Sequence, residues 1–76
     1  MEDTIYWLIH ESTSGDSYYY CGYYEAGNPV FNMAIADAVH IASLENAKMI
    51  FKVLNRIIPC DILVVEKHSL TKVFPK

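Results

Sequence analysis

Apolar and polar residues alternate along the first part of the chain, which predicts two β-strands joined by a turn. Residues 4–11 present two sets of side chains at every second position: Ile5, Trp7 and Ile9 on one face, and Tyr6, Leu8 and His10 on the other. Residues 12–17 are rich in Ser, Gly and Asp, which favour a turn. Residues 18–25 alternate again, so we expect residues 4–25 to form an antiparallel hairpin.

Two short elements are predicted between this hairpin and the next long apolar pattern. Residues 26–29 break the chain, and residues 30–33 are predicted to be a third strand, because the residue before Pro29 is driven to an extended conformation. Residues 35–39 are predicted to form one helical turn with Ile35 and Ala38 facing inward, followed by a brief extended connection.

An amphipathic helix over about residues 44–58 is the clearest element. Ser43 is a good N-cap, Glu45 suits the positive end of the helix dipole, and Pro59 is expected to stop the helix. The buried stripe follows the i, i+3, i+4 spacing and consists of Ala47, Ile50, Phe51, Leu54 and Ile58.

The last part of the chain completes the sheet. Residues 60–66 are almost continuously apolar, as expected of a central or fully covered strand, and residues 70–74 are predicted to be either a last short strand or a docked tail. The sequence therefore predicts an α+β fold, in which an antiparallel sheet of four or five strands has one main helix on one face. With 76 residues, we expect a single compact domain over residues 1–76.

Composition and charge restrict the class of protein. The chain is 53% hydrophobic and 20% charged, which favours a folded domain over a disordered one. No apolar run has the ~18 residues of a membrane span, and the acidic N-terminus does not resemble a secretory signal. We therefore expect a cytoplasmic location with no membrane contact. In that reducing compartment Cys21 and Cys60 are expected to be free thiols.

Charge is distributed unevenly along the chain. Residues 1–47 contain seven acids and no Lys or Arg, which gives −7, whereas residues 48–76 contain six basic residues and two acids, which gives +4. This separation predicts a polarised surface, unless the two halves interleave in the fold and neutralise one another locally.

The tyrosines are the most unusual feature. Five of the six lie within residues 18–24, and on a strand Tyr18, Tyr20 and Tyr24 share one side. We expect these three to lie on the sheet face away from the helix, as rigid amphipathic anchors for a partner. The predicted partner-binding surface comprises Tyr6, Tyr18, Tyr20 and Tyr24, with Glu11, Asp16 and Glu25 near its edges. The other interpretation is cross-strand aromatic pairing that only stabilises the hairpin.

Charge also bears on the kind of partner. Lys48, Lys52 and Arg56 recur at every fourth position and form either a solvated helix face or a secondary contact with an acidic partner or a nucleic-acid backbone. No Lys or Arg accompanies the tyrosines, so direct binding of nucleic acid is disfavoured. An acidic surface bearing tyrosines suits the basic groove of a nucleic-acid-handling protein better.

Signatures of catalysis or metal binding are not evident in the sequence. The three histidines and two cysteines lack the spacing of metal-binding motifs, and no GxSxG or P-loop motif occurs. His10 and Glu11 are adjacent, so on a strand they point to opposite faces and cannot form an acid–base pair. We therefore expect a protein that is not an enzyme and that needs neither cofactor nor metal.

Residues 29–47, PVFNMAIADAVHIASLENA, resemble a set of very small phage and mobile-element accessory proteins. The matching positions are Phe31, Ile35, Ala38, Ile41, Ser43 and Ala47, and the resemblance extends over roughly residues 18–66. It implies a stoichiometric inhibitor of a host protein or defence complex, a class that includes anti-CRISPR proteins. The alternative is a homo-oligomeric accessory module, such as a homodimer that buries the tyrosine face. An enzyme or small-ligand binder is the least favoured alternative.

Overall fold

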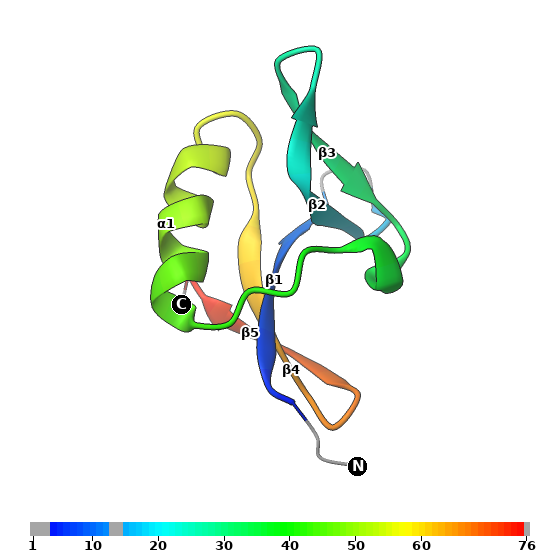
Figure 1. Ribbon diagram of the computed structural model, residues 1–76, viewed down its shortest axis with the longest axis vertical. Coiled ribbons are helices and arrows are strands. Elements are labelled where there is room, and N and C mark those ends of the chain that lie inside the picture. Colours follow the sequence, from blue (N-terminus) through cyan, green and yellow to red (C-terminus); the bar gives the residue numbers. More distant parts are fainter. Residues whose placement is uncertain (1–3, 13–14, 76) are drawn as a thin grey trace.

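The computed structural model describes residues 4–12 and 15–75 and shows a five-stranded sheet with one main helix (Figure 1). The elements are β1 (Tyr6–Glu11), β2 (Tyr18–Glu25), β3 (Asn28–Asn32), the 3₁₀ turn η1 (Ile35–Asp37), α1 (Leu44–Leu54), β4 (Asp61–Glu66) and β5 (Ser69–Phe74). All strand pairs are antiparallel, in the order β3-β2-β1-β4-β5. The predicted α+β fold is confirmed, and the last segment is a strand rather than a tail.

Helix α1 begins where the sequence predicts and ends earlier. The Ser43 hydroxyl accepts a hydrogen bond from the backbone N–H of Asn46 at 3.1 Å, as an N-cap does. Beyond Leu54 the backbone tightens into turns, in which the N–H of Ile57 donates to the carbonyl of Leu54 at 2.9 Å. The Asn55 side chain accepts from the N–H of Cys60, so the chain leaves the helix before Pro59 can act as the stop.

Both faces of the sheet are covered. On one face, Ile9 of β1 and Ile62 of β4 pack with Ala47 and Leu54 of α1, and all four are fully buried. On the opposite face, buried residues of three strands pack with Ala38, and the half-buried Ile35 adds to this second cluster; the strand residues are Leu8, Tyr19, Leu63 and Val65. Ile35 and Ala38, which the sequence predicted to face inward, therefore cover the sheet face that α1 does not reach.

The connection between η1 and α1 fills a split between β1 and β2. These two strands pair only at His10 with Tyr19 and Glu11 with Tyr18. Beyond that point the Val39 N–H donates to the Tyr20 carbonyl at 2.9 Å, and Ile41 exchanges two backbone hydrogen bonds with Trp7. In Figure 1 this green segment passes directly in front of β1. The chain thus crosses from the second cluster to the α1 side through the sheet.

The β2–β3 hairpin extends beyond the rest of the sheet, at the top of Figure 1. Its turn contains Ala26 and Gly27, both with positive φ, and β3 begins at Asn28, two residues before the predicted start. The pairing between β2 and β3 shifts between Tyr20 and Tyr24. Gly22 lies in this irregular stretch with φ of +95°, a conformation that favours glycine.

Candidate functional site

The three tyrosines predicted to share the open face of the sheet do not lie there. Tyr20 is 7% exposed and belongs to the same buried cluster as Ala47 and Leu54 of α1. Tyr18 is half-buried, and Tyr24 is exposed but contacts Tyr20 edge-to-face at 6.3 Å between ring centroids. The predicted position away from the helix is therefore wrong for Tyr20, and Tyr24 lies beside it at the α1 side.

The strand register explains this correction. Trp7 and Ile9 of β1 face α1, and Glu11, two residues after Ile9, points to the same face of the strand. Because Glu11 pairs with Tyr18, the set that contains Tyr18 and Tyr20 must also face α1. Alternation separated the two sets of tyrosines correctly, but alternation does not say which set meets the helix.

The remaining predicted residues are scattered. Tyr6 stacks on His40 with ring centroids 4.0 Å apart and belongs to the cluster on the face opposite α1. Glu11 is only 6% exposed, so its carboxylate is not available at the rim of a binding surface as predicted. Asp16 and Glu25 are exposed, in the turn before β2 and at the end of β2. The seven predicted residues therefore do not form one surface.

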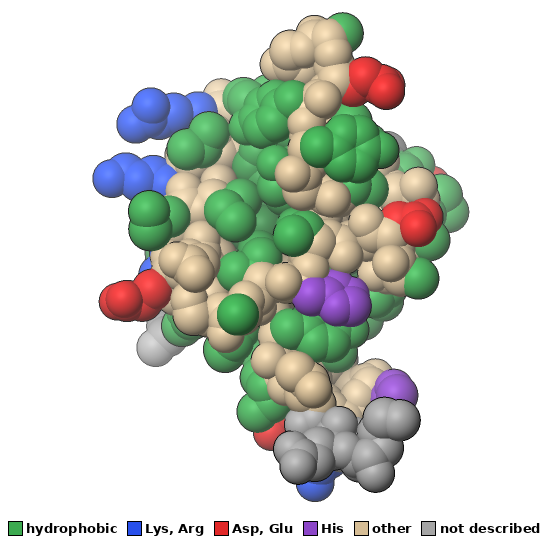
Figure 2. Space-filling model, viewed as in Figure 1, with side chains coloured by type: hydrophobic (Ala, Val, Ile, Leu, Met, Phe, Trp, Pro, Cys, Tyr) green, Lys and Arg blue, Asp and Glu red, His purple; other side chains and the backbone are tan. Residues whose placement is uncertain are grey.

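A different apolar surface does form between α1 and the β2–β3 hairpin. We call it the helix–hairpin face and define it as Tyr24, Phe31, Met49, Val53 and Ile57. Four of these are large hydrophobic side chains between 45% and 69% exposed, and Phe31 is half-buried against Tyr20. Figure 2 shows hydrophobic side chains gathered between α1 and the hairpin. Exposed apolar clusters of this kind mark interaction sites.

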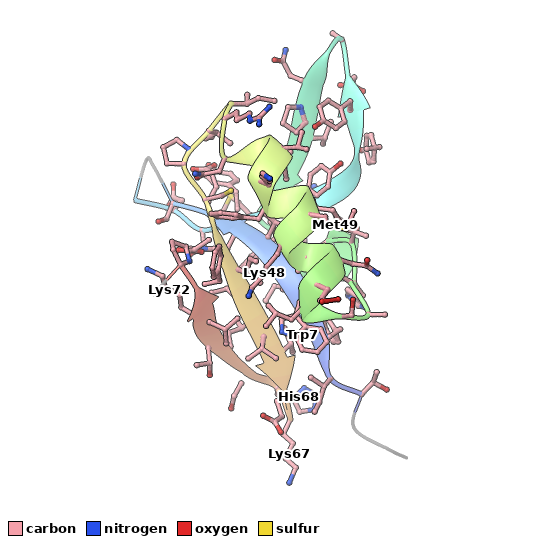
Figure 3. The ribbon with its side chains drawn as sticks, turned by 90° about the vertical axis from the view of Figure 1, so that its left-hand side faces the viewer. Trp7, Lys48, Met49, Lys67, His68 and Lys72 are labelled. Atoms are coloured by element: carbon pink, nitrogen blue, oxygen red, sulfur yellow. The ribbon has the colours of Figure 1, made fainter. Side chains whose placement is uncertain are left out.

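The helix residues of this face form a second apolar row beside the buried stripe. Met49 and Val53 are one turn apart, and Ile57 follows at the same spacing in the turn after the helix. The row borders Ile50, which packs against the helix-side core. In Figure 3, Met49 and Lys48 point to opposite sides of α1. The sequence contained this signal as a repeat of apolar residues at every fourth position, but the interpretation above assigned only the buried stripe.

Charged side chains flank the helix–hairpin face with opposite sign. In Figure 2, Lys and Arg side chains project at one end of the α1 side, an acidic side chain projects at the other end of that side, and further acidic side chains project near the hairpin and η1; the first turn of α1 carries the exposed Glu45. Exposed Lys52 and Arg56 belong to α1 and the turn after it, whereas exposed Glu25 and Asp37 belong to β2 and η1. A ligand that spans this face therefore meets an apolar centre between a basic and an acidic border.

Of the predicted basic stripe, Lys48 points away from Met49 across α1, whereas Lys52 lies one turn from Met49. Lys48 and Lys52 line a groove of about 300 Å³ together with Phe51, Asn55 and Phe74. The Lys48 ammonium lies 5.0 Å from the centre of the Phe74 ring, a cation–π contact that holds this side chain against β5. Arg56 is exposed beyond the end of α1. Part of the stripe is therefore used in packing.

Burial raises the pKa of three ionisable groups. It raises the pKa of the Tyr20 phenol, and the neighbouring Tyr24 adds to this shift. Burial, aided by Asp37, raises the pKa of the Cys21 thiol. Burial, then Asp61 and Glu11, raises the pKa of Cys60 from the usual 9.0 to about 11. Both cysteines are free thiols, and neither has the lowered pKa of a reactive nucleophile.

Metal-ligand groups and membrane-spanning helices are absent from the described residues. Within residues 4–12 and 15–75, no three His, Cys, Asp or Glu side chains are grouped as a metal ion requires. No helix in the described part of the chain has both the length and the apolar character needed to span a membrane. The sequence matches no protein-family model and no curated protein, and the fold matches no solved structure. The resemblance to small phage proteins therefore stays a prediction.

Proposed function

We propose that this protein acts by binding another protein through the helix–hairpin face. The observation that carries the proposal is the group of Tyr24, Met49, Val53 and Ile57, which are all large, hydrophobic and exposed. A chain of 76 residues needs its apolar side chains to close the core, so leaving four of them on one face has a cost that a partner would offset.

The chemistry of this face defines the partner. A complementary protein surface has an apolar centre, acidic groups that meet Lys52 and Arg56, and basic groups that meet Glu25. Tyr24 and Met49 supply the kind of large side chains that dominate binding energy at protein interfaces. The resemblance to phage accessory proteins makes a host protein or defence complex the first class of partner to test, including one that handles nucleic acid. The role there is that of a stoichiometric inhibitor.

Exposed-residue substitutions test the proposal without disturbing the core. We expect Met49→Ser and Val53→Ser to lower the affinity for proteins captured from a host lysate by about tenfold or more each. Leu70→Ser is the matched control, since Leu70 is 43% exposed and lies on β5, outside this face. Quantitative mass spectrometry of the captured proteins gives the readout, with thermal melting to confirm that all variants fold. Equal capture by all variants contradicts the proposal.

The alternative to a host protein is a second copy of this chain that covers the helix–hairpin face. Light scattering at high micromolar concentration distinguishes a monomer from a dimer. A dimer that dissociates on Val53→Ser but not on Leu70→Ser would assign the helix–hairpin face to self-association. That result would replace the host-protein proposal with the homo-oligomeric module.

A further inference from the structure

Three polar side chains form a hydrogen-bonded row on the sheet face opposite α1. His10 Nδ1 lies 2.8 Å from Asp61 Oδ1, and His10 Nε2 lies 3.1 Å from Ser17 Oγ. The imidazole also packs against the Tyr19 ring, with centroids 5.5 Å apart. A hydroxyl, an imidazole and a carboxylate joined in this order make up the nucleophile, base and orienting group of serine hydrolases.

The strand register produces this row from residues that are distant in the sequence. His10 of β1 pairs with Tyr19 on β2 and with Asp61 on β4, so these three side chains point to one face. Ser17 precedes β2 by one residue and has the parity of Tyr19, which directs its hydroxyl to the same face. The adjacent pair His10 and Glu11 was correctly excluded as an acid–base pair, but the partner of His10 lies across the sheet instead.

The surroundings define which atom holds the proton. A carboxylate only accepts hydrogen bonds, so Nδ1 of a neutral His10 carries the proton and donates it to Asp61. Nε2 then has a free lone pair and accepts the hydrogen bond of the Ser17 hydroxyl. The side chains of His10 and Asp61 are 14% and 24% exposed, which limits competition from water, whereas Ser17 is exposed to a ligand.

We propose that Ser17 is an activated nucleophile that takes an acyl group from a small ester. The Ser17 Oγ attacks the carbonyl carbon and forms a new C–O bond, while its proton passes to Nε2 of His10. The ester C–O bond breaks, and the departing alcohol or phenol oxygen takes that proton. Water then attacks the acyl-serine by the reverse route, which releases a carboxylic acid and restores Ser17. Asp61 is a positioning residue that keeps the imidazole in the required tautomer.

The second nucleophile near this row does not compete with Ser17. Cys60 lines a cavity of about 260 Å³ together with His10, Asp61, Ser12 and Pro59. Its thiol stays protonated at neutral pH, because burial raises its pKa to about 11. The His10 row and the helix–hairpin face lie on opposite faces of the sheet, so each can be disrupted without the other.

The test uses 4-nitrophenyl acetate and the full chain near pH 8. We expect release of 4-nitrophenolate with the gain of one acetyl group per protein, which peptide mapping by mass spectrometry places on Ser17. Ser17→Ala should abolish this acetylation, and His10→Ala should slow it by about 100-fold or more, with partial rescue by added imidazole. Ser69→Ala is the matched control, because Ser69 is an exposed serine at the start of β5, at the far end of β4 from Asp61, and it should leave the rate unchanged.

The role of Asp61 is tested by a measurement that distinguishes the orientation of His10 from a general effect on folding. We expect Asp61→Asn to slow acetylation of Ser17 by about tenfold or more in a protein whose circular dichroism is unchanged, because the amide no longer holds the tautomer. Asp61→Glu should recover part of the rate. Acetylation that maps to lysine or tyrosine side chains and persists in Ser17→Ala would overturn the proposal. Equal acetylation rates for Asp61→Asn and the unchanged protein would show that Asp61 does not position His10 for the reaction.

Discussion

At the scale of single residues, the aromatic side chains of β2 fill the core on both faces of the sheet: Tyr20 packs with α1, and Tyr19 packs with Ala38 on the opposite face. Alternation along β2 separated Tyr18 and Tyr20 from Tyr19 correctly, yet both Tyr19 and Tyr20 are buried. The reason is that η1 covers the second face of the sheet, a contact that depends on where a short segment folds back rather than on any periodic pattern. Aromatic residues in a small domain are therefore drawn into the core wherever a second layer exists, and their number alone does not mark a surface.

The burial of Tyr20 leads to a stability prediction. Tyr20→Ala should lower the free energy of unfolding by about 3 kcal/mol, because the substitution removes a large side chain from the packing around Ala47 and Leu54. Tyr24→Ala should cost less than about 1 kcal/mol, since Tyr24 is 45% exposed. Urea denaturation measures both. Similar losses for the two variants would show that Tyr20 is not a core residue.

At the scale of elements, the sequence predicted β1 to β4 and the start of α1 within a few residues, and it left the last segment open as a strand or a docked tail. Periodicity, turn composition and the Ser43 N-cap are local signals, and they carried this part of the fold. The insertion of residues 39–41 between β1 and β2 had no such signal, because it depends on backbone groups of Trp7 and Tyr20 that the two strands leave unpaired with each other. The order of the strands, which brings His10 to Asp61, also lacks a local signal, because it depends on contacts between residues that are far apart in the sequence.

The inserted segment, residues 39–41, leaves little room for a side chain at Gly22 of β2. A Cβ added at Gly22 would lie 3.0 Å from the Cβ of Val39, and the φ of +95° already disfavours any other residue. We expect Gly22→Ala to lower the free energy of unfolding by about 2–3 kcal/mol in urea denaturation. Gly27→Ala is the matched control, because its φ of +83° is similar but nothing lies within 4 Å of its added Cβ, so it should cost about 1 kcal/mol.

A double substitution separates the contact from the backbone strain. If the Val39 side chain causes the additional loss, Gly22→Ala should cost less in a Val39→Ala background than in the unchanged protein, by about 1 kcal/mol. Equal costs in both backgrounds would show that the segment does not press on β2 at Gly22.

At the scale of the whole molecule, the sheet order decides how charge is arranged. The acidic first half of the chain supplies β1, β2 and β3, and the basic second half supplies β4, β5 and most of α1. Because the strands do not interleave, the separation of charge along the sequence becomes a separation across the molecule. Lys67 and Lys72 lie on the β4–β5 side, away from the hairpin (Figure 3). The helix–hairpin face lies between the two charged regions, which steers a partner of complementary polarity into one orientation.

This arrangement can be tested before any partner is known. Fluorescent dyes such as bis-ANS bind exposed apolar surface, and we expect the folded protein to bind the dye at the helix–hairpin face. The double variant Met49→Ser/Val53→Ser should lose at least about half of the fluorescence increase, because it removes two of the most exposed apolar side chains of that face. Leu70→Ser should change the signal little, although Leu70 is itself 43% exposed, because it lies outside the cluster.

Equal fluorescence from the double variant and the unchanged protein would mean that these side chains do not act as one surface. The helix–hairpin face would then no longer support the binding function, whereas the acylation of Ser17 would be unaffected by that result.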